Sequence, residues 1–261
     1  MDRLQPQEYV AKRILPLARA YVASCLRARG YSQHRLARLL GVTQPMIYKY
    51  TRVEPSQYLE KLGGLGVPVG AAKLVLEELC DRLPEEPSML AVAANILAHE
   101  SSYCSRRPRE CSMVLCRGKT LIEEAYWIVL RRLLSTPGLH SIIPEVGSNL
   151  AYAPKGAESL GEVMGLDGRI IRVRPNRVLA AGRPVPGGST HTGRVALKYA
   201  RQWGSDAWAF AVRAPVVARV PLEGVALETE EGEGREPVAY LVSSDPQALL
   251  EAVRRLALLH V

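Results

Sequence analysis

The strongest constraint on the fold is a change of pattern near residue 138. Before it, apolar residues recur at helical spacing, as they do over residues 6–29. After it come short runs rich in Val, Ile and Leu that are separated by Gly and Pro, which is typical of strands. A chain of 261 residues is also long enough for two domains. The sequence therefore predicts an all-α N-terminal part followed by an α/β domain with a mixed sheet flanked by helices.

The same patterns predict individual elements. In the first part, helices are expected over 6–29, from the cap Ser32 to Leu40, from the cap Thr43 onward, and over 68–83, 87–100 and 119–134. In the second part, helices are expected at 156–164, 191–203 and 245–260, and strands at IIPEV (142–146), GRIIRVR (168–174), RVLAAG (177–182) and PVAYLV (237–242). The acidic, Gly-rich stretch ETEEGEGREP (228–237) is predicted to form a loop.

Positive charge is concentrated at the N-terminal end. Residues 1–59 hold ten Lys and Arg against three Asp and Glu, a net charge of +7, whereas the remaining 24 basic and 23 acidic residues nearly cancel. A basic module beside a neutral body indicates a polyanion as partner, although a solvated basic face would give the same count. The chain contains no apolar run long enough to span a membrane and no apolar signal core, so a cytoplasmic protein is expected.

Residues 33–52, QHRLARLLGVTQPMIYKYTR, have the spacing of a tight helix-turn-helix. Ala37 has to be small beneath the crossing helix, Gly41 suits a left-handed turn, and Ile47 belongs to the shared core. Leu36, Leu40, Val42 and Tyr50 are expected to complete that core. The stretch resembles the helix-turn-helix of lambda-repressor-like regulators of bacteria and archaea.

The polar residues of this segment then face outward, toward a DNA major groove. Gln44 can pair with adenine through two hydrogen bonds, and Lys49 suits guanine or phosphate. Gln33 and Arg35 are better placed for backbone phosphates. The expected DNA-binding residues are Gln33, Arg35, Thr43, Gln44, Pro45, Tyr48 and Lys49. A helical hairpin without a role in DNA binding is the alternative.

Five cysteines in a chain of this length do not indicate a disulfide scaffold, so reduced thiols and no metal are expected. Cys25 and Cys80 lie in apolar helical patterns and are expected in the core. One metal alternative stays open, because three cysteines and an upstream histidine could form a tetrahedral site, although only one of their intervals fits zinc spacing. Its ligands would be Cys104, Cys111, Cys116 and His99.

Five fragments follow one another in the second half of the chain: IPEVGSNLAYAPKGA (143–157), EVMGLDGRIIRV (162–173), AAGRPVPGGSTHTGRVAL (180–197), GREP (234–237) and SSDPQALLEAVRRL (243–256). From about residue 139 to the end, this series resembles the ThiN-type thiamine-phosphate synthase domain of archaea and some bacteria. That domain occurs alone, fused to a pyrimidine kinase, or fused to a helix-turn-helix as a thiamine-responsive regulator. The order of parts here resembles the last arrangement, an archaeal ThiR-like transcriptional regulator.

A site for thiamine phosphate has to bind a phosphate, a thiazolium cation and an aminopyrimidine. The Gly-Gly-Ser-Thr stretch before the helix at 191–203 suits the phosphate, with Ser189 as the helix cap. Arg169 could bind the phosphate through two parallel N–H groups of its guanidinium fork. Asn149 can present a donor and an acceptor to a pyrimidine edge. The expected ligand-binding residues are Asn149, Arg169, Gly188, Ser189, Thr190 and His191.

By resemblance, Arg169 and His191 stand where the family's synthases need an Arg and a His, with Mg²⁺ required if the domain is active. Two departures favour a sensor. In the stretch WAFAVRAPV, Ala209 or Ala211 stands near the position of a family Asn, and the following segment up to GREP is short. We therefore expect a degenerate synthase domain without a catalytic residue or cofactor.

These features predict three segments: a helix-turn-helix DNA-binding domain (1–66), a helical connector and dimerisation segment (67–138), and a ThiN-like ligand-binding domain (139–261). The expected function is a homodimeric transcriptional regulator of thiamine metabolism that binds a double-stranded DNA operator and senses thiamine phosphate or thiamine diphosphate. One alternative is an active synthase that joins hydroxymethylpyrimidine diphosphate and thiazole phosphate. Another is a constitutive DNA-binding protein whose second part only dimerises.

Overall fold

The computed structural model describes residues 4–115, 120–174, 176–217, 222–230 and 236–259. The chain divides into two compact units, Met1–Ala125 and Tyr126–Val261. The boundary falls within helix α10 (Leu121–Leu134), upstream of the change in sequence pattern near residue 138. No helix of the described residues is long and apolar enough to cross a membrane.

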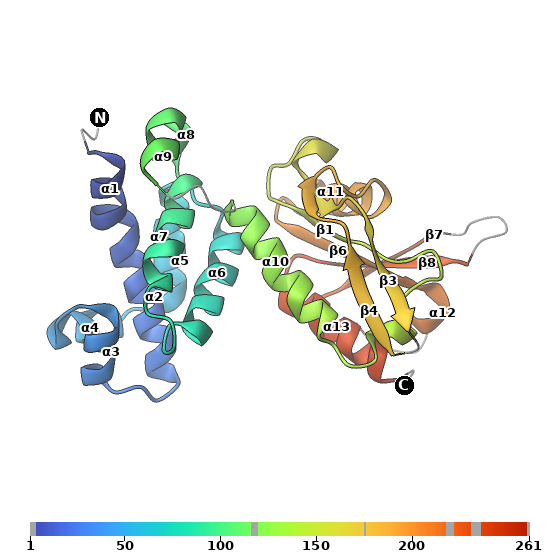
Figure 1. The fold of residues 1–261 in the computed structure, drawn as a ribbon, viewed down its shortest axis with the longest axis horizontal. Coiled ribbons are helices and arrows are strands. Elements are labelled where there is room, and N and C mark those ends of the chain that lie inside the picture. Colours follow the sequence, from blue (N-terminus) through green and yellow to red (C-terminus); the bar gives the residue numbers. More distant parts are fainter. Residues whose placement is uncertain (1–3, 116–119, 175, 218–221, 231–235, 260–261) are drawn as a thin grey trace. The chain divides into compact units, whose positions relative to one another are not determined.

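The first unit is entirely helical (Figure 1). The helix expected over 6–29 forms as one continuous rod that includes a π-helical stretch, η1. Around its second half, α2, pack the helices α5, α6 and α7. The segment expected to be a separate connector from residue 67 onward therefore supplies part of this core. The elements are α1 (Pro6–Tyr9), η1 (Val10–Ile14), α2 (Leu15–Ala28), α3 (Gln33–Leu40), α4 (Gln44–Tyr50), α5 (Pro55–Gly64), α6 (Val69–Arg82), α7 (Met89–His99), α8 (Ser102–Ser105) and α9 (Pro108–Val114).

Two cysteines of the first unit correct the expectation of reduced thiols. Cys104 in α8 and Cys111 in α9 form a disulfide, and both are buried. Their sulfur atoms bind each other, so the metal alternative loses two of its ligands, and Cys116 lies outside the described residues. In the described part of the chain, no group of three His, Cys, Asp or Glu side chains is arranged to hold a metal. Cys80 is buried as expected, and Cys25 is half-buried.

The second unit is built on a six-stranded sheet in the order β5-β2-β1-β6-β8-β7. All its described pairings are antiparallel, so the expectation of a mixed sheet is wrong. A separate hairpin, β3–β4, lies beside it. The strands are β1 (Leu150–Ala153), β2 (Met164–Leu166), β3 (Arg169–Arg174), β4 (Arg177–Ala181), β5 (Pro184–Pro186), β6 (Ala207–Arg213), β7 (Ala226–Glu230) and β8 (Val238–Ser243). The helices are η2 (Leu139–Ser141), η3 (Leu160–Glu162), α11 (His191–Trp203), α12 (Ala214–Val217) and α13 (Pro246–Leu258).

The two faces of the sheet differ in side-chain size because the residues of β6 alternate. Ala207, Ala209 and Ala211 face α11, and their small side chains let that helix pack closely. On the opposite face Trp208 stacks on Tyr152, with ring centroids 4.1 Å apart. Helix α13 packs on this second face against β6 and β8 (Figure 1), and Tyr126 of α10 stacks on Trp208 there. The helices therefore flank the sheet, as the sequence predicts.

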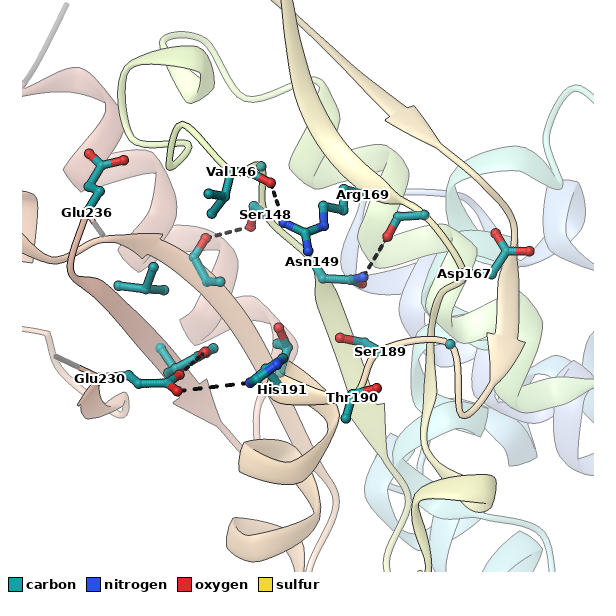
Figure 2. Close-up of a pocket in the computed structure, with 17 residues that line it drawn as sticks. Val146, Ser148, Asn149, Asp167, Arg169, Ser189, Thr190, His191, Glu230 and Glu236 are labelled. Atoms are coloured by element: carbon teal, nitrogen blue, oxygen red, sulfur yellow. Dashed lines mark hydrogen bonds and ion pairs between the residues drawn. The ribbon is translucent and has the colours of Figure 1, made fainter. Parts of the chain in front are cut away.

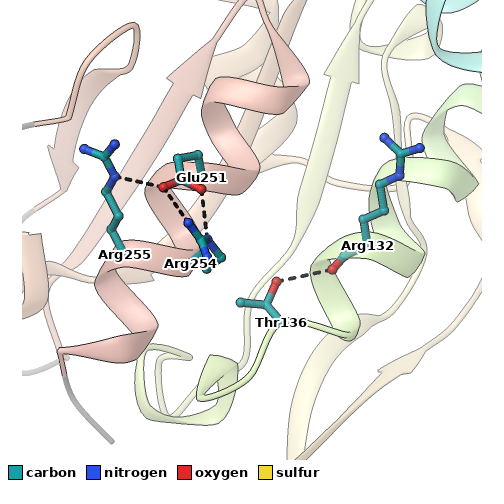
Figure 3. Close-up of polar contacts among 5 residues, drawn as sticks. All are labelled: Arg132, Thr136, Glu251, Arg254 and Arg255. Atoms are coloured by element: carbon teal, nitrogen blue, oxygen red, sulfur yellow. Dashed lines mark hydrogen bonds and ion pairs between the residues drawn. The ribbon is translucent and has the colours of Figure 1, made fainter. Parts of the chain in front are cut away.

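Polar contacts stabilise the ends and outer surfaces of these covering helices. The hydroxyl of Thr136 donates to the carbonyl of Arg132 at the end of α10, over 3.2 Å (Figure 3). On α13, Glu251 accepts hydrogen bonds from Arg254 and Arg255 over 2.9–3.0 Å. These bonds lower the pKa of Glu251 to about 2.

Three local predictions of the second part are wrong in whole or in part. Residues 142–146 form no strand and follow the single turn η2. In the segment expected to be a helix at 156–164, only η3 is helical, and Met164 already belongs to β2, which pairs with β1. The stretch expected to be a loop at 228–237 begins inside β7, and its residues 231–235 lie outside the described residues. At Met164 and in β7, pairing with a neighbouring strand outweighs the local pattern.

Candidate functional sites

A cavity of about 470 Å³ opens in the second unit beside the N-terminus of α11 (Figure 2). It is lined by loops before β1, β3 and α11 and by residues of β6, β7 and β8. All six residues expected to bind a ligand line this one cavity, although they are spread over more than forty positions of the chain: Asn149, Arg169, Gly188, Ser189, Thr190 and His191.

The glycines of the GGST stretch determine the shape of the loop before α11. Gly187 has a φ of +75°, in the left-handed region that favours glycine. Gly188 lies so close to β2 that an added Cβ would be 2.4 Å from the carbonyl oxygen of Gly165. The loop therefore packs directly on the sheet and carries the buried Ser189 with it.

Helix α11 begins at His191, and its first backbone N–H groups have no acceptor within the helix. Together with the helix dipole they place partial positive charge at the cavity. The N-cap is Thr190, and its side chain makes no capping hydrogen bond. The prediction of Ser189 as the cap is therefore wrong.

Asn149 has a structural role that its sequence position does not reveal. Its Nδ2 donates to the carbonyls of Leu166 (3.1 Å) and Gly168 (3.0 Å), and its Oδ1 accepts from the N–H of Leu166 (3.1 Å). Both donors of the amide are thus used by the backbone. Asn149 lines the cavity but holds the β2–β3 connection in place, and it has no donor left for a pyrimidine edge.

Arg169 is the first residue of β3 and is exposed. Its Nη1 donates to the carbonyl of Val146 over 2.5 Å, and Figure 2 shows its guanidinium between Val146 and Asn149, on the side of the cavity where Ser189 lies. The remaining N–H groups of the fork are available to an anion.

An acidic wall faces this positive end, made of Glu230 from β7 and Glu236 just before β8. The hydroxyl of the buried Tyr240 donates to Glu230 over 2.7 Å, and the other oxygen of Glu230 is 4.0 Å from Nδ1 of His191. Burial, and then the hydrogen bond with Glu230, raise the pKa of Tyr240. The phenol therefore stays protonated and keeps Glu230 in position.

Glu236 is fixed by two donors. Arg213 donates to it over 2.5 Å and the backbone N–H of Glu145 over 2.8 Å. Burial acts to raise the pKa of Glu236, but these two hydrogen bonds outweigh it and the net pKa is lowered. Sequence reasoning missed both glutamates as cavity residues. Glu236 lies within the quoted GREP fragment, whereas Glu230 is one of several acids in the run 228–237.

The structure also distinguishes Ala209 from Ala211, the two residues of β6 that stand near the position of the family Asn. Ala211 lines the cavity, whereas Ala209 is buried in the core beneath α11. Of the two alanines that stand near the position of the family Asn, only Ala211 therefore lines the cavity.

The first unit carries the expected helix pair α3–α4, joined by a turn in which Gly41 has a φ of +63°. Ser32 caps α3 by accepting from the N–H of Arg35 over 3.2 Å, as predicted. Thr43 occupies the N-cap of α4 without a side-chain hydrogen bond, contrary to expectation. Leu36, Leu40 and Ile47 are buried between the helices, and Val42 and Tyr50 are half-buried.

The outward surface of α3–α4 has the side chains that were expected there. Of these seven residues Gln33 is half-buried, and the other six are exposed: Arg35, Thr43, Gln44, Pro45, Tyr48 and Lys49. The geometry of the helix pair shows a polar, basic surface.

Comparison with known proteins identifies part of the second unit. Residues 128–220 match the family described as thiamine-phosphate synthase ThiN. This match to the ThiN family lies within the second unit. The ThiN match begins within α10, upstream of residue 139, and ends before Glu230, Glu236 and Tyr240.

Two solved structures resemble this chain. The C-terminal domain of a phosphomethylpyrimidine kinase is 22% identical, with a TM-score of 0.43, and the match covers 52% of this chain and 97% of that one. The C-terminal domain of the protein MJ0236 is 17% identical, with a TM-score of 0.42, and the match covers 54% of this chain and 94% of that one. None of the curated proteins matches the chain.

Proposed function

We propose that this chain is a DNA-binding transcriptional regulator of thiamine metabolism, and that the cavity beside α11 binds thiamine phosphate or thiamine diphosphate. One observation carries the ligand half of the proposal. A loop suited to phosphate and an acidic wall suited to a cation line the same cavity, which has the volume of a small-molecule site.

The ends of the cavity correspond to the two charges of thiamine phosphate. Arg169, His191 and the N-terminus of α11 form an end that favours a phosphate. Glu230 and Glu236 form an end that favours a cation such as a thiazolium ring. A ligand with only one of these charges would satisfy only half of the site.

The same geometry favours a sensor over a synthase. Expulsion of a diphosphate needs strong positive charge at the leaving group, and Mg²⁺ usually contributes it. Of the wall carboxylates, Glu236 already accepts two hydrogen bonds and Glu230 accepts one from Tyr240. These hydrogen bonds leave fewer carboxylate lone pairs for a protein-held Mg²⁺, which a dispersed thiazolium charge does not need, and the neighbouring Ala211 adds no ligand.

The DNA-binding half rests on the first unit. The exposed surface of α3–α4 offers amide, hydroxyl and ammonium groups, and residues 1–59 carry a net charge of +7. Such a surface suits a major groove and its phosphates. A homodimer would bring two recognition helices to half-sites about one helical turn apart.

Regulation then requires that the ligand bind one state of the protein better than another, because only differential binding shifts an equilibrium. Titration calorimetry of the full chain with thiamine, thiamine phosphate and thiamine diphosphate tests this directly. We expect a phosphorylated form to bind and to change the affinity for operator DNA. The sensor proposal fails if none of the three releases heat or alters DNA binding.

The synthase alternative has its own test. Incubation with hydroxymethylpyrimidine diphosphate, thiazole phosphate and Mg²⁺ would yield thiamine phosphate if the domain were active. Robust turnover that His191→Ala abolishes would replace the sensor by an enzyme. Absence of product from a protein that binds thiamine phosphate supports the sensor.

A further inference from the structure

Two side chains of the helix pair are joined across the turn. Gln44 is the first residue of α4, and its Nε2 is 2.9 Å from Nδ1 of His34, the second residue of α3. Both residues are exposed. The helices that carry them are held together by Leu36, Leu40 and Ile47, which are buried, so the bond links two fixed backbone positions.

The chemistry of this bond determines what Gln44 can offer to a base. A glutamine amide has two N–H donors and one oxygen acceptor. In the bond seen here Nδ1 of His34 accepts one N–H, which requires a neutral ring with its proton on Nε2. The other N–H and Oε1 remain, side by side on the amide.

A neighbouring donor and acceptor is the pattern that pairs with adenine, whose N7 accepts and whose N6 amino group donates. If the amide were turned over, Oε1 would face His34 and only N–H donors would face outward. That pattern suits guanine, which presents two acceptors at N7 and O6. The orientation of this one amide therefore determines whether Gln44 suits adenine or guanine.

We propose that His34 is a positioning residue that selects adenine by holding the amide of Gln44 in the orientation described above. The proposal rests on the proposed DNA binding. In this proposal His34 itself contacts no base. Nothing in the sequence singles out His34, because the histidine lies on α3 and the reader on α4.

A selection from random double-stranded DNA with the purified full chain tests the proposal. We expect the wild type to enrich adenine at one position of each half-site and Gln44→Ala to lose that preference. His34→Ala should lower the preference at the same position by about threefold or more, since a good bidentate pair is worth roughly 1–3 kcal/mol of discrimination. Non-specific affinity should stay within about twofold.

Two further variants separate positioning from a merely structural role. His34→Gln supplies a side-chain oxygen that can accept from Gln44 and should restore the adenine preference. The double variant His34→Ala with Gln44→Ala should equal Gln44→Ala alone, because His34 acts only through Gln44. Circular dichroism checks that the helices persist in each variant.

Several outcomes would overturn the inference. If Gln44→Ala loses the preference and His34→Ala keeps it, His34 does not position the reader, and DNA binding still stands. If His34→Ala weakens binding to all sequences equally, the histidine contacts the backbone instead. If the wild type binds no DNA at all, the proposed function itself fails, and the inference with it.

Discussion

Gly188 and Gly165 approach so closely that neither position has room for a side chain. A Cβ on Gly188 would be 2.4 Å from the carbonyl oxygen of Gly165, and a Cβ on Gly165 would be 2.8 Å from the backbone nitrogen of Ser189. The loop before α11 thus lies on β2 without an intervening side chain. This contact sets the position of the helix N-terminus at the cavity.

Substitution of Gly188 by Ala should therefore damage the cavity more than the fold. The methyl group has to push the loop away from β2, at a cost of roughly 1–3 kcal/mol in stability. Displacement of the helix N-terminus should weaken binding of thiamine phosphate by about tenfold or more, as calorimetry would measure. Gly161→Ala is the matched control, because its nearest neighbour would be 3.6 Å away. Equal affinities for the two variants would contradict this account.

Asn149→Ala should act mainly on stability. It leaves the carbonyls of Leu166 and Gly168 and the N–H of Leu166 without the amide that binds them. We expect a loss of about 2–4 kcal/mol in the free energy of unfolding of the second unit. Urea unfolding followed by tryptophan fluorescence measures it, since all three Trp residues lie after residue 125. Asn176→Ala, an exposed position in the β3–β4 turn, should change little.

Opposite ends of the cavity should respond to different parts of the ligand. Arg169→Ala should weaken binding of thiamine phosphate and of inorganic phosphate alike, because both present the same anion to the fork. Glu230→Gln should weaken thiamine phosphate severalfold and leave inorganic phosphate unchanged, because only the former carries a cation. Competition of the two ligands in calorimetry separates these effects. A Glu230→Gln variant that loses phosphate binding would show that the charge assignment of the cavity is wrong.

Elements with strong local signals could be predicted from the sequence. The cap Ser32 and the turn at Gly41 carry their own conformational preferences, so the α3–α4 pair follows from the sequence. The glycines before α11 and the apolar stripe along it predict this helix. The six ligand-binding candidates all line one cavity. They could be chosen from the sequence because the resemblance to the ThiN-type domain pointed to their motifs.

Features that depend on tertiary pairing could not be predicted. Strands β2 and β5 have three residues each and exist only through their partners, so no periodicity reveals them. Glu230 reaches the cavity because β7 pairs with β8, whereas its sequence neighbourhood suggests a loop. The disulfide between Cys104 and Cys111 likewise depends on how α8 and α9 pack.

Asp206, between α11 and β6, should make stability depend on pH. Burial raises its pKa above the ordinary value of 3.8, although the N–H of Lys155 donates to it over 2.7 Å and acts in the opposite direction. An acid whose pKa is raised by folding contributes stability below its unfolded pKa, and this contribution is lost as the pH rises through the folded pKa. Asp206→Asn should remove that loss. Urea unfolding at several pH values above 3.8 would show a smaller decrease for the variant than for the wild type, and identical profiles would contradict the assignment.

The wall of the cavity comes from the last strands of the chain, since Glu230, Glu236 and Tyr240 all follow residue 225. The α3–α4 pair, in contrast, ends at Tyr50. During synthesis on the ribosome, a nascent chain therefore possesses its helix pair long before it can enclose a ligand. If the cavity binds the proposed ligand, a chain that stops short of β8 lacks the wall that the ligand needs, and a prematurely terminated product would keep the basic helices without the proposed control.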